Sequence, residues 1–147
     1  MQDKIDGFYG KYFFLSNFYP TPVVYNGMRF NNTEAAFQAA KCPYRMEEFC
    51  GLNPSDAKRL GRRVHLRDDW EEVKDQVMYD VCVAKFTQSP PLTIALLETG
   101  NAELIEGNTW GDKVWGVCNG VGENRLGKIL MRIRDELRVK QEGGSWC

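Results

Sequence analysis

Three polar residues of one short segment have the spacing of a helix face. Glu34, Gln38 and Lys41 lie at positions i, i+4 and i+7, and seven steps of about 100° return to within about 20° of the starting direction. The other residues of this segment are mostly alanines, which let neighbouring elements approach and leave the polar stripe lining a cleft. A carboxylate and an amine on one face are group types used in acid–base and nucleophilic catalysis. The alternative is that Glu34 and Lys41 are surface residues that complement the helix dipole.

A glycine- and tryptophan-rich segment is the second candidate for a site. It reads TWGDKVWGVCNGVGENRLG over residues 109–127 and enters a helix at about Glu123. Such a loop can bring backbone N–H groups and a helix N-terminus up to a phosphate. It matches neither the Walker A pattern nor the dinucleotide-binding pattern of glycines. Trp110 and Trp115 are either stacking partners for a base or sugar, or residues of the core.

Basic side chains cluster in the middle of the chain and could hold phosphates or a nucleic-acid backbone. They are Lys58, Arg59, Arg62, Arg63 and Arg67, with Trp70 just beyond them. Four acidic residues between 68 and 72 largely cancel this charge, so a solvated face with one arginine in a site is the alternative. The single histidine, His65, has no nucleophile near it in sequence, and we assign it no catalytic part.

Length, charge and cysteine content limit the classes of protein to which the chain can belong. The chain has 147 residues and a formal net charge of -1, which predicts one compact domain without long-range attraction to nucleic acid or an anionic membrane. We place its core at about residues 5–141, followed by a short tail over 142–147. Five widely spaced cysteines without a CxxC pair predict reduced thiols, no metal site and a cytoplasmic location. We expect neither a signal peptide nor a membrane span.

Turn and cap signals predict an α+β fold that is mostly helical with a small β element. Asn26-Gly27 predicts a β-hairpin over residues 22–30. Caps, prolines and apolar periodicity predict the helices, which we place at residues 33–41, 44–50, 54–60, 69–87, 91–99 and from about 123 onward. Asn31, Asn32 or Thr33 is expected to cap the first of them, and Asn53 the one that starts at Pro54. A strand is expected at 103–106.

Eight sequence blocks, taken in order, resemble the NADAR family, also called the YbiA-like family. They are FLSNFYP at 14–20, TEAAFQAAK at 33–41, LGR at 60–62, DDWEEVKDQVM at 68–78, AKF at 84–86, LIE at 104–106, DKVWG at 112–116 and GENRLGKILM at 122–131. The blocks span about residues 8 to 138, and their order is far more specific than any single block. The resemblance implies a small, mostly helical α+β domain that hydrolyses N-glycosidic bonds to ribose.

The resemblance also assigns residues. It implies that Glu34 is the family's essential glutamate and that Lys41 is the lysine of the same block. Ligand contacts fall by resemblance on Asn17, Phe18, Arg62, Trp70, Asp112, Trp115 and Asn124. No cofactor or metal is implied.

Cleavage at C1 of ribose explains why these residue types are needed. Positive charge develops on the sugar as the base leaves, so a carboxylate such as Glu34 stabilises that state and can deprotonate the attacking water. Asp112 is the candidate for protonating the leaving nitrogen. Lys41 either orients Glu34 or attacks C1 to form a Schiff base, and we favour the Schiff base. Trp70 and Trp115 are expected to stack on the base or sugar.

The substrate is less constrained than the bond type. The family acts on ADP-ribose linked to guanine and on ribosylamino-phosphate intermediates of riboflavin synthesis. Cys118, Val121 and the pair Ala35-Ala36 depart from the YbiA pattern near the expected pocket. We favour an ADP-ribosylated guanine nucleotide or nucleic-acid end over a phosphoribosylated small molecule. A module that only binds ADP-ribose or NAD, and a scaffold with a vestigial pocket, are the alternatives from other classes.

Overall fold

The computed structural model describes residues 3–143, which form two compact units. The central unit runs from Asn17 to Gln88, and the terminal unit combines residues 3–16 with residues 89–143. The expected α+β class is confirmed, because helices dominate both units and the strands of residues 3–143 form two-stranded sheets. The predicted tail lies mostly at residues 144–147, outside the described residues.

The central unit begins with the predicted β-hairpin. Strands β2 (Val23–Tyr25) and β3 (Met28–Phe30) pair antiparallel. Asn26 and Gly27 join them with φ values of 52° and 74°, the two positive values that a tight hairpin turn of this kind requires. The prediction of the hairpin is therefore confirmed.

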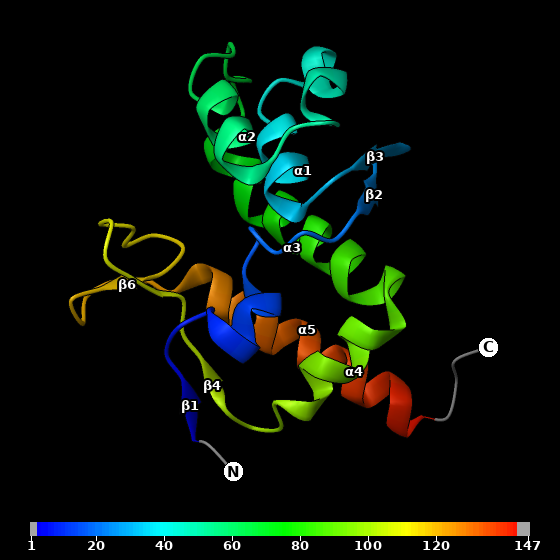
Figure 1. The fold of residues 1–147 in the computed structure, drawn as a ribbon, viewed down its shortest axis with the longest axis vertical. Coiled ribbons are helices and arrows are strands. Elements are labelled where there is room, and N and C mark those ends of the chain that lie inside the picture. Colours follow the sequence, from blue (N-terminus) through cyan, green and yellow to red (C-terminus); the bar gives the residue numbers. More distant parts are fainter. Residues whose placement is uncertain (1–2, 144–147) are drawn as a thin grey trace. The chain divides into compact units, whose positions relative to one another are not determined.

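Helix α1 (Thr33–Ala39) lies at the heart of the central unit. Asn32 caps it by accepting a hydrogen bond from the Ala35 N–H at 2.8 Å. All residues of α1 are buried, because the hairpin, α2, α3 and the 3₁₀ segment η2 (Pro43–Phe49) pack around it. Figure 1 shows α1 (cyan) among these elements. Alanines on its surface allow this close approach.

Two further helices complete the central unit. Helix α2 (Pro54–Gly61) starts at the predicted Asn53 cap, whose side chain accepts from the Asp56 N–H at 2.8 Å. Helix α3 (Trp70–Gln88) follows the predicted periodicity. Its last residue clamps the hairpin, since the Gln88 side chain bonds both the N–H and the carbonyl of Val24 at 2.8 Å.

The terminal unit joins strands from distant parts of the chain. β1 (Lys4–Ile5) pairs in parallel with β4 (Glu103–Leu104), and β5 (Gly107–Asn108) pairs in parallel with β6 (Val117–Cys118). The 3₁₀ segment η1 (Gly10–Leu15) follows β1.

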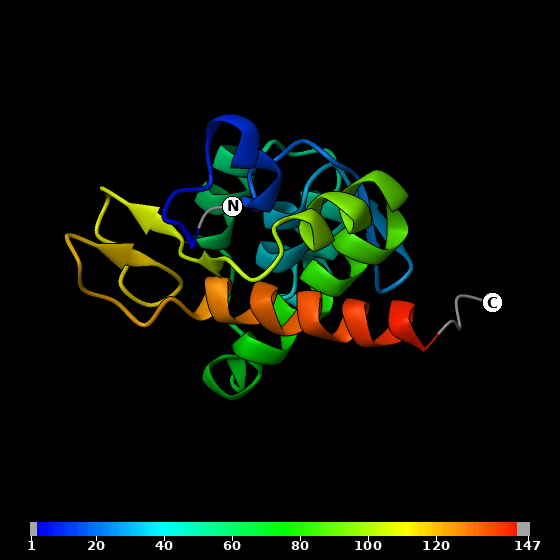
Figure 2. The ribbon, with the colours of Figure 1, turned by 90° about the horizontal axis from the view of Figure 1, so that it is seen from below.

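Helices α4 (Pro90–Glu98) and α5 (Arg125–Glu142) pack on each other, and α5 also covers β4. Figure 2 shows α5 (orange to red) along its length. Its apolar face is buried at Leu126, Leu130, Ile133 and Leu137. Among residues 3–143, none of the helices combines the length and apolarity needed to cross a membrane.

Several element boundaries differ from the sequence expectation. The strand expected at 103–106 is ordered as a strand only at Glu103–Leu104, and the helix expected at 44–50 is a 3₁₀ segment. Helix α5 begins at Arg125 instead of near Glu123, because Asn124 adopts a left-handed conformation with φ of 52°. Within the described part of the chain Cys42, Cys50, Cys82 and Cys118 are free thiols, and Cys147 lies outside it.

Candidate functional site

The Glu34 carboxylate is buried and held in one orientation by its own helix. Glu34 is 8% exposed. Its Oε2 accepts a hydrogen bond of 2.7 Å from Nε2 of Gln38, one turn further along α1. Its backbone N–H donates to the carbonyl of Asn17 at 3.1 Å, which ties the start of the helix to the preceding loop. A buried, oriented carboxylate is the kind of group that catalysis at a cationic centre requires.

Lys41 shares the environment of Glu34. Burial is the main cause that lowers the pKa of Lys41, the Glu34 carboxylate opposes this effect, and the cations of Arg62, Lys58 and Lys74 add to the lowering. A lowered pKa increases the fraction of neutral amine near neutral pH, and the neutral form is the nucleophile.

The aromatic ring of Trp70 lies beside Lys41. The Lys41 Nζ lies 5.9 Å from the centre of the Trp70 ring. Trp70 packs against Phe37 with ring centroids 5.2 Å apart and an interplanar angle of 58°. Trp70 is 6% exposed, so most of its surface is part of the core. Its stacking on the base or sugar stays a prediction.

Three other predicted site residues lie in the same unit. Asn17 is buried; its Nδ2 lies 3.2 Å from the Met78 sulfur, and its Oδ1 accepts from the Cys82 thiol at 3.8 Å. Phe18 is half-buried with the Lys58 ammonium 5.7 Å from its ring centre. Arg62 is exposed, directly after α2. The central unit therefore brings Glu34, Lys41, Trp70 and the predicted cations together.

Unsatisfied buried polar atoms accompany Glu34. Among the described residues, the buried side-chain atoms without a hydrogen-bond partner are Thr33 Oγ1, Gln38 Oε1 and Arg134 Nε. Two of them belong to α1, next to Glu34 in sequence or bonded to it. Leaving one such atom unpaired costs about 1–3 kcal/mol, and a catalytic role is one of the explanations for an unpaired buried group in a native protein.

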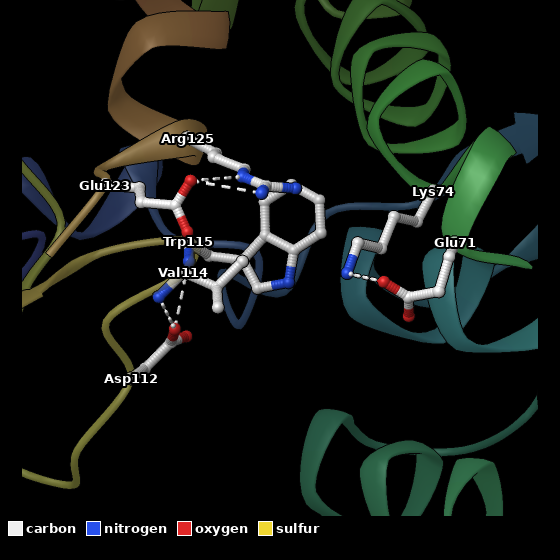
Figure 3. A network of polar contacts seen from close by, with 7 residues as sticks. All are labelled: Glu71, Lys74, Asp112, Val114, Trp115, Glu123 and Arg125. Carbon is white, nitrogen blue, oxygen red and sulfur yellow. Dashed lines mark hydrogen bonds and ion pairs between the residues drawn. The ribbon is translucent and has the colours of Figure 1, made fainter.

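In the terminal unit, Asp112 anchors the loop that carries Trp115. Its Oδ1 accepts hydrogen bonds from the N–H groups of Val114 at 3.1 Å and Trp115 at 2.9 Å, as drawn in Figure 3. Asn108 bonds Asp112 from the other side, accepting from its N–H at 3.0 Å and donating to its carbonyl at 2.9 Å. These contacts make Asp112 a residue that positions Trp115, which is half-buried. Its predicted role in protonating the leaving group stays a prediction.

Asn124 also serves the fold of its unit. Its Nδ2 donates to the Leu104 carbonyl and its Oδ1 accepts from the Glu106 N–H, both at 2.9 Å. It lines a polar pocket of about 680 Å³ together with charged residues of both signs, among them Glu123 and Lys128. Substrate contact by Asn124 stays a prediction.

Ion pairs flank both groups of predicted site residues. Arg125 and Glu123 pair at 3.0 Å at the start of α5, and Lys74 and Glu71 pair at 2.7 Å in the first turns of α3 (Figure 3). Within residues 3–143, no group of three or more His, Cys, Asp or Glu side chains is arranged to hold a metal ion.

Gln38 lies on the helix face that the sequence predicts, but no role in the site is predicted for it. The i, i+4 spacing put it on the same face as Glu34, yet no site role was given to it. The spacing was the available signal, because a glutamine one turn after a glutamate can donate to that carboxylate.

Comparison with known proteins defines the class. The NADAR domain family model matches residues 7–138. The chain is 40% identical to N-glycosidase YbiA of Shigella flexneri serotype 5b over 150 residues, covering 96% of this chain and 93% of that protein. The solution structure of the Escherichia coli protein YbiA matches with a TM-score of 0.84 and 39% identity, covering 97% of this chain and 89% of that chain. The chain therefore belongs to the NADAR family.

A third relative is named for a biosynthetic pathway instead of a glycosidase activity. The riboflavin biosynthesis protein VVA0006 of Vibrio vulnificus is 37% identical over 131 residues, which cover 85% of this chain and 35% of that longer protein. Because relatives about 40% identical to this chain are named N-glycosidases, and the chain belongs to the NADAR family, the chain is a hydrolase that acts on N-glycosyl bonds.

Proposed function

We propose that this N-glycosidase cleaves the bond between C1 of ribose and a base nitrogen, and that its substrate is an ADP-ribosylated guanine nucleotide or nucleic-acid end. The observation that carries the proposal is a buried, oriented Glu34 carboxylate that acts electrostatically on Lys41, whose pKa is lowered mainly by burial. A carboxylate beside an amine suits a reaction that develops positive charge at a sugar carbon.

The charge around Lys41 supports a diphosphate substrate. The charges of Arg62, Lys58 and Lys74 each lower the pKa of Lys41, so three cations act on this amine, and one of them, Lys74, is also paired with Glu71. ADP-ribose carries two linked phosphates, whereas a phosphoribosylated small molecule carries one. Several cations with an exposed arginine among them match the larger anionic charge better.

Glu34 acts on the sugar in this proposal. Its negative charge stabilises the oxocarbenium-like state as the C1–N bond breaks and the bonding electrons move to the leaving nitrogen. In direct hydrolysis Glu34 takes a proton from the attacking water while the leaving base gains one. The products are ADP-ribose and the unmodified base.

Lys41 supplies the alternative first step that we favour. Its neutral amine attacks C1 and expels the base, the ring oxygen then leaves C1 and gains a proton, and a Schiff base to the open sugar results. Water hydrolyses the imine, which regenerates Lys41 and releases ADP-ribose. The net reaction in both routes is the addition of one water across the C1–N bond.

A phosphoribosylated intermediate of riboflavin synthesis is the second candidate substrate. It is favoured by the similarity to the Vibrio vulnificus protein, whose name places it in riboflavin biosynthesis. The same carboxylate and amine would perform the same bond cleavage on it.

Mass spectrometry of two parallel reactions tests the proposal. The purified chain is incubated with a guanine oligonucleotide that carries ADP-ribose and, separately, with a ribosylamino-pyrimidine phosphate. We expect the oligonucleotide to lose the ADP-ribosyl group, a mass equal to ADP-ribose less one water, while the pyrimidine compound is turned over at least 10-fold more slowly. Faster release of the pyrimidine amine would establish the second candidate. Survival of both compounds would refute cleavage of either substrate class.

A further inference from the structure

The hydrogen bond from Gln38 that orients Glu34 depends on Gly61, a residue of the neighbouring helix α2. Gln38 is 4% exposed, and its Nε2 donates to Glu34 Oε2 at 2.7 Å. The other end of the same amide, Oε1, is buried without a hydrogen-bond partner. No hydrogen bond from the described residues fixes the amide at Oε1, so packing holds this end of the side chain in place.

Gly61, the last residue of α2, provides that packing. A Cβ atom built on Gly61 would lie 2.0 Å from Gln38 Oε1 and 2.9 Å from its Cδ. Its φ lies outside the left-handed range, so the glycine is not needed for the backbone of α2. The absence of a side chain at position 61 is what admits the Gln38 amide in the orientation that reaches Glu34.

From this geometry we propose that Gln38 and Gly61 form a positioning pair for Glu34, in which Gly61 makes the space and Gln38 directs the carboxylate toward the sugar. The inference rests on the proposed function for its effect on catalysis. The pairing itself is a property of the fold and is testable without a substrate.

The amide orientation follows from the chemistry of its partner. A carboxylate accepts hydrogen bonds, so the NH₂ end of Gln38 must face Glu34 and the carbonyl end must face Gly61. A side chain at position 61 would strike the far end of a flexible glutamine, which can move aside without disturbing the backbone. Gly61→Ala therefore keeps the fold and displaces the amide from Glu34.

Four variants separate positioning from general damage. They are Gln38→Met, Gly61→Ala, the two combined, and Gly51→Ala as the matched control. Gly51 lies in the same unit, has no atom within 4 Å of a built Cβ and does not need a left-handed φ. Methionine keeps the length and apolar contacts of glutamine but has no donor.

The kinetic readout is kcat against KM. We expect Gln38→Met and Gly61→Ala each to lower kcat by about 10- to 100-fold, the range for losing one charge-assisted hydrogen bond, with KM within about twofold of wild type. The double variant should lose no more than Gln38→Met alone, and Gly51→Ala should keep wild-type kcat. Wild-type kcat in Gly61→Ala, or losses that multiply in the double variant, would overturn the inference while the proposed function stands.

A spectroscopic readout tests the pairing even if no substrate is cleaved. In a ¹H–¹⁵N spectrum the side-chain NH₂ of Gln38, assigned from its loss in Gln38→Met, should shift in Glu34→Ala and in Gly61→Ala but stay unchanged in Gly51→Ala. An unchanged Gln38 signal in either of the first two variants contradicts the pairing.

Discussion

Lys85 is a buried lysine whose removal should change how stability depends on pH. It is 1% exposed, and burial lowers the pKa of its ammonium from 10.5 to about 7. Its Nζ lies 4.9 Å from the ring centre of Phe86 and 5.8 Å from that of Tyr19. The unfolded chain holds the proton up to pH 10.5, so folding releases a proton between pH 7 and 10.5.

The sign and size of the effect follow from that difference. Because the unfolded state binds more protons in this window, the free energy of unfolding of the wild type rises with pH there and levels off below pH 7. At 1.36 kcal/mol for each unit of pKa, the full window corresponds to about 5 kcal/mol, and each pH unit within it to about 1.4 kcal/mol.

Urea denaturation of wild type and Lys85→Met at pH 7, 8 and 9 measures this effect. Methionine removes the titrating group and keeps the apolar stem. We expect the free energy of unfolding of wild type to rise relative to the variant by about 2 kcal/mol from pH 7 to pH 9. Lys128→Met, at an exposed lysine of α5, should track the wild type. A difference between wild type and Lys85→Met that is constant over this range would refute the reasoning.

Two further predictions concern Asp112 and Lys41. Asp112→Ala removes the acceptor of two backbone hydrogen bonds, so the amides of Val114 and Trp115 should lose protection against hydrogen exchange by about 10-fold or more; unchanged protection would contradict the anchoring role. Sodium borohydride added during turnover should leave a stable mass adduct on Lys41, and trapping should increase with pH as the amine, whose pKa burial lowers, loses its proton. Full activity in Lys41→Arg would exclude the Schiff base.

The elements with strong local signals were predictable from the sequence. Asn26-Gly27 specified the hairpin turn, and the side chains of Asn32 and Asn53 cap α1 and α2 as expected. These features depend on residues close in sequence, where local geometry leaves few choices.

Features set by distant contacts were not predictable. The two-residue strands β1, β5 and β6 are too short to show a periodic pattern, and β1 pairs with β4, from Lys4 to Glu103, across about two thirds of the chain. The role of Asp112 in bonding two backbone amides depends on a loop conformation that its sequence does not reveal. The effect of Gly61 on Gln38 depends on how α2 packs against α1.

The burial of Lys85 is only partly predictable from the sequence. It follows Val77 and Val81 at intervals of four on α3, so the helical spacing places it on the buried face. Apolar periodicity alone does not predict that a lysine at such a position stays inside, since burying a charge is costly and lysines usually reach the solvent.

Glu34→Gln tests the central claim, that the Glu34 face of α1 performs the chemistry. The measurement is kcat on the substrate that the wild type cleaves, together with the Kd for ADP-ribose from calorimetry. Because the substitution keeps the shape and removes the charge, we expect kcat to fall by at least about 100-fold while Kd stays within about threefold of wild type. A variant that retains more than a tenth of wild-type kcat would show that Glu34 is not at the reacting carbon.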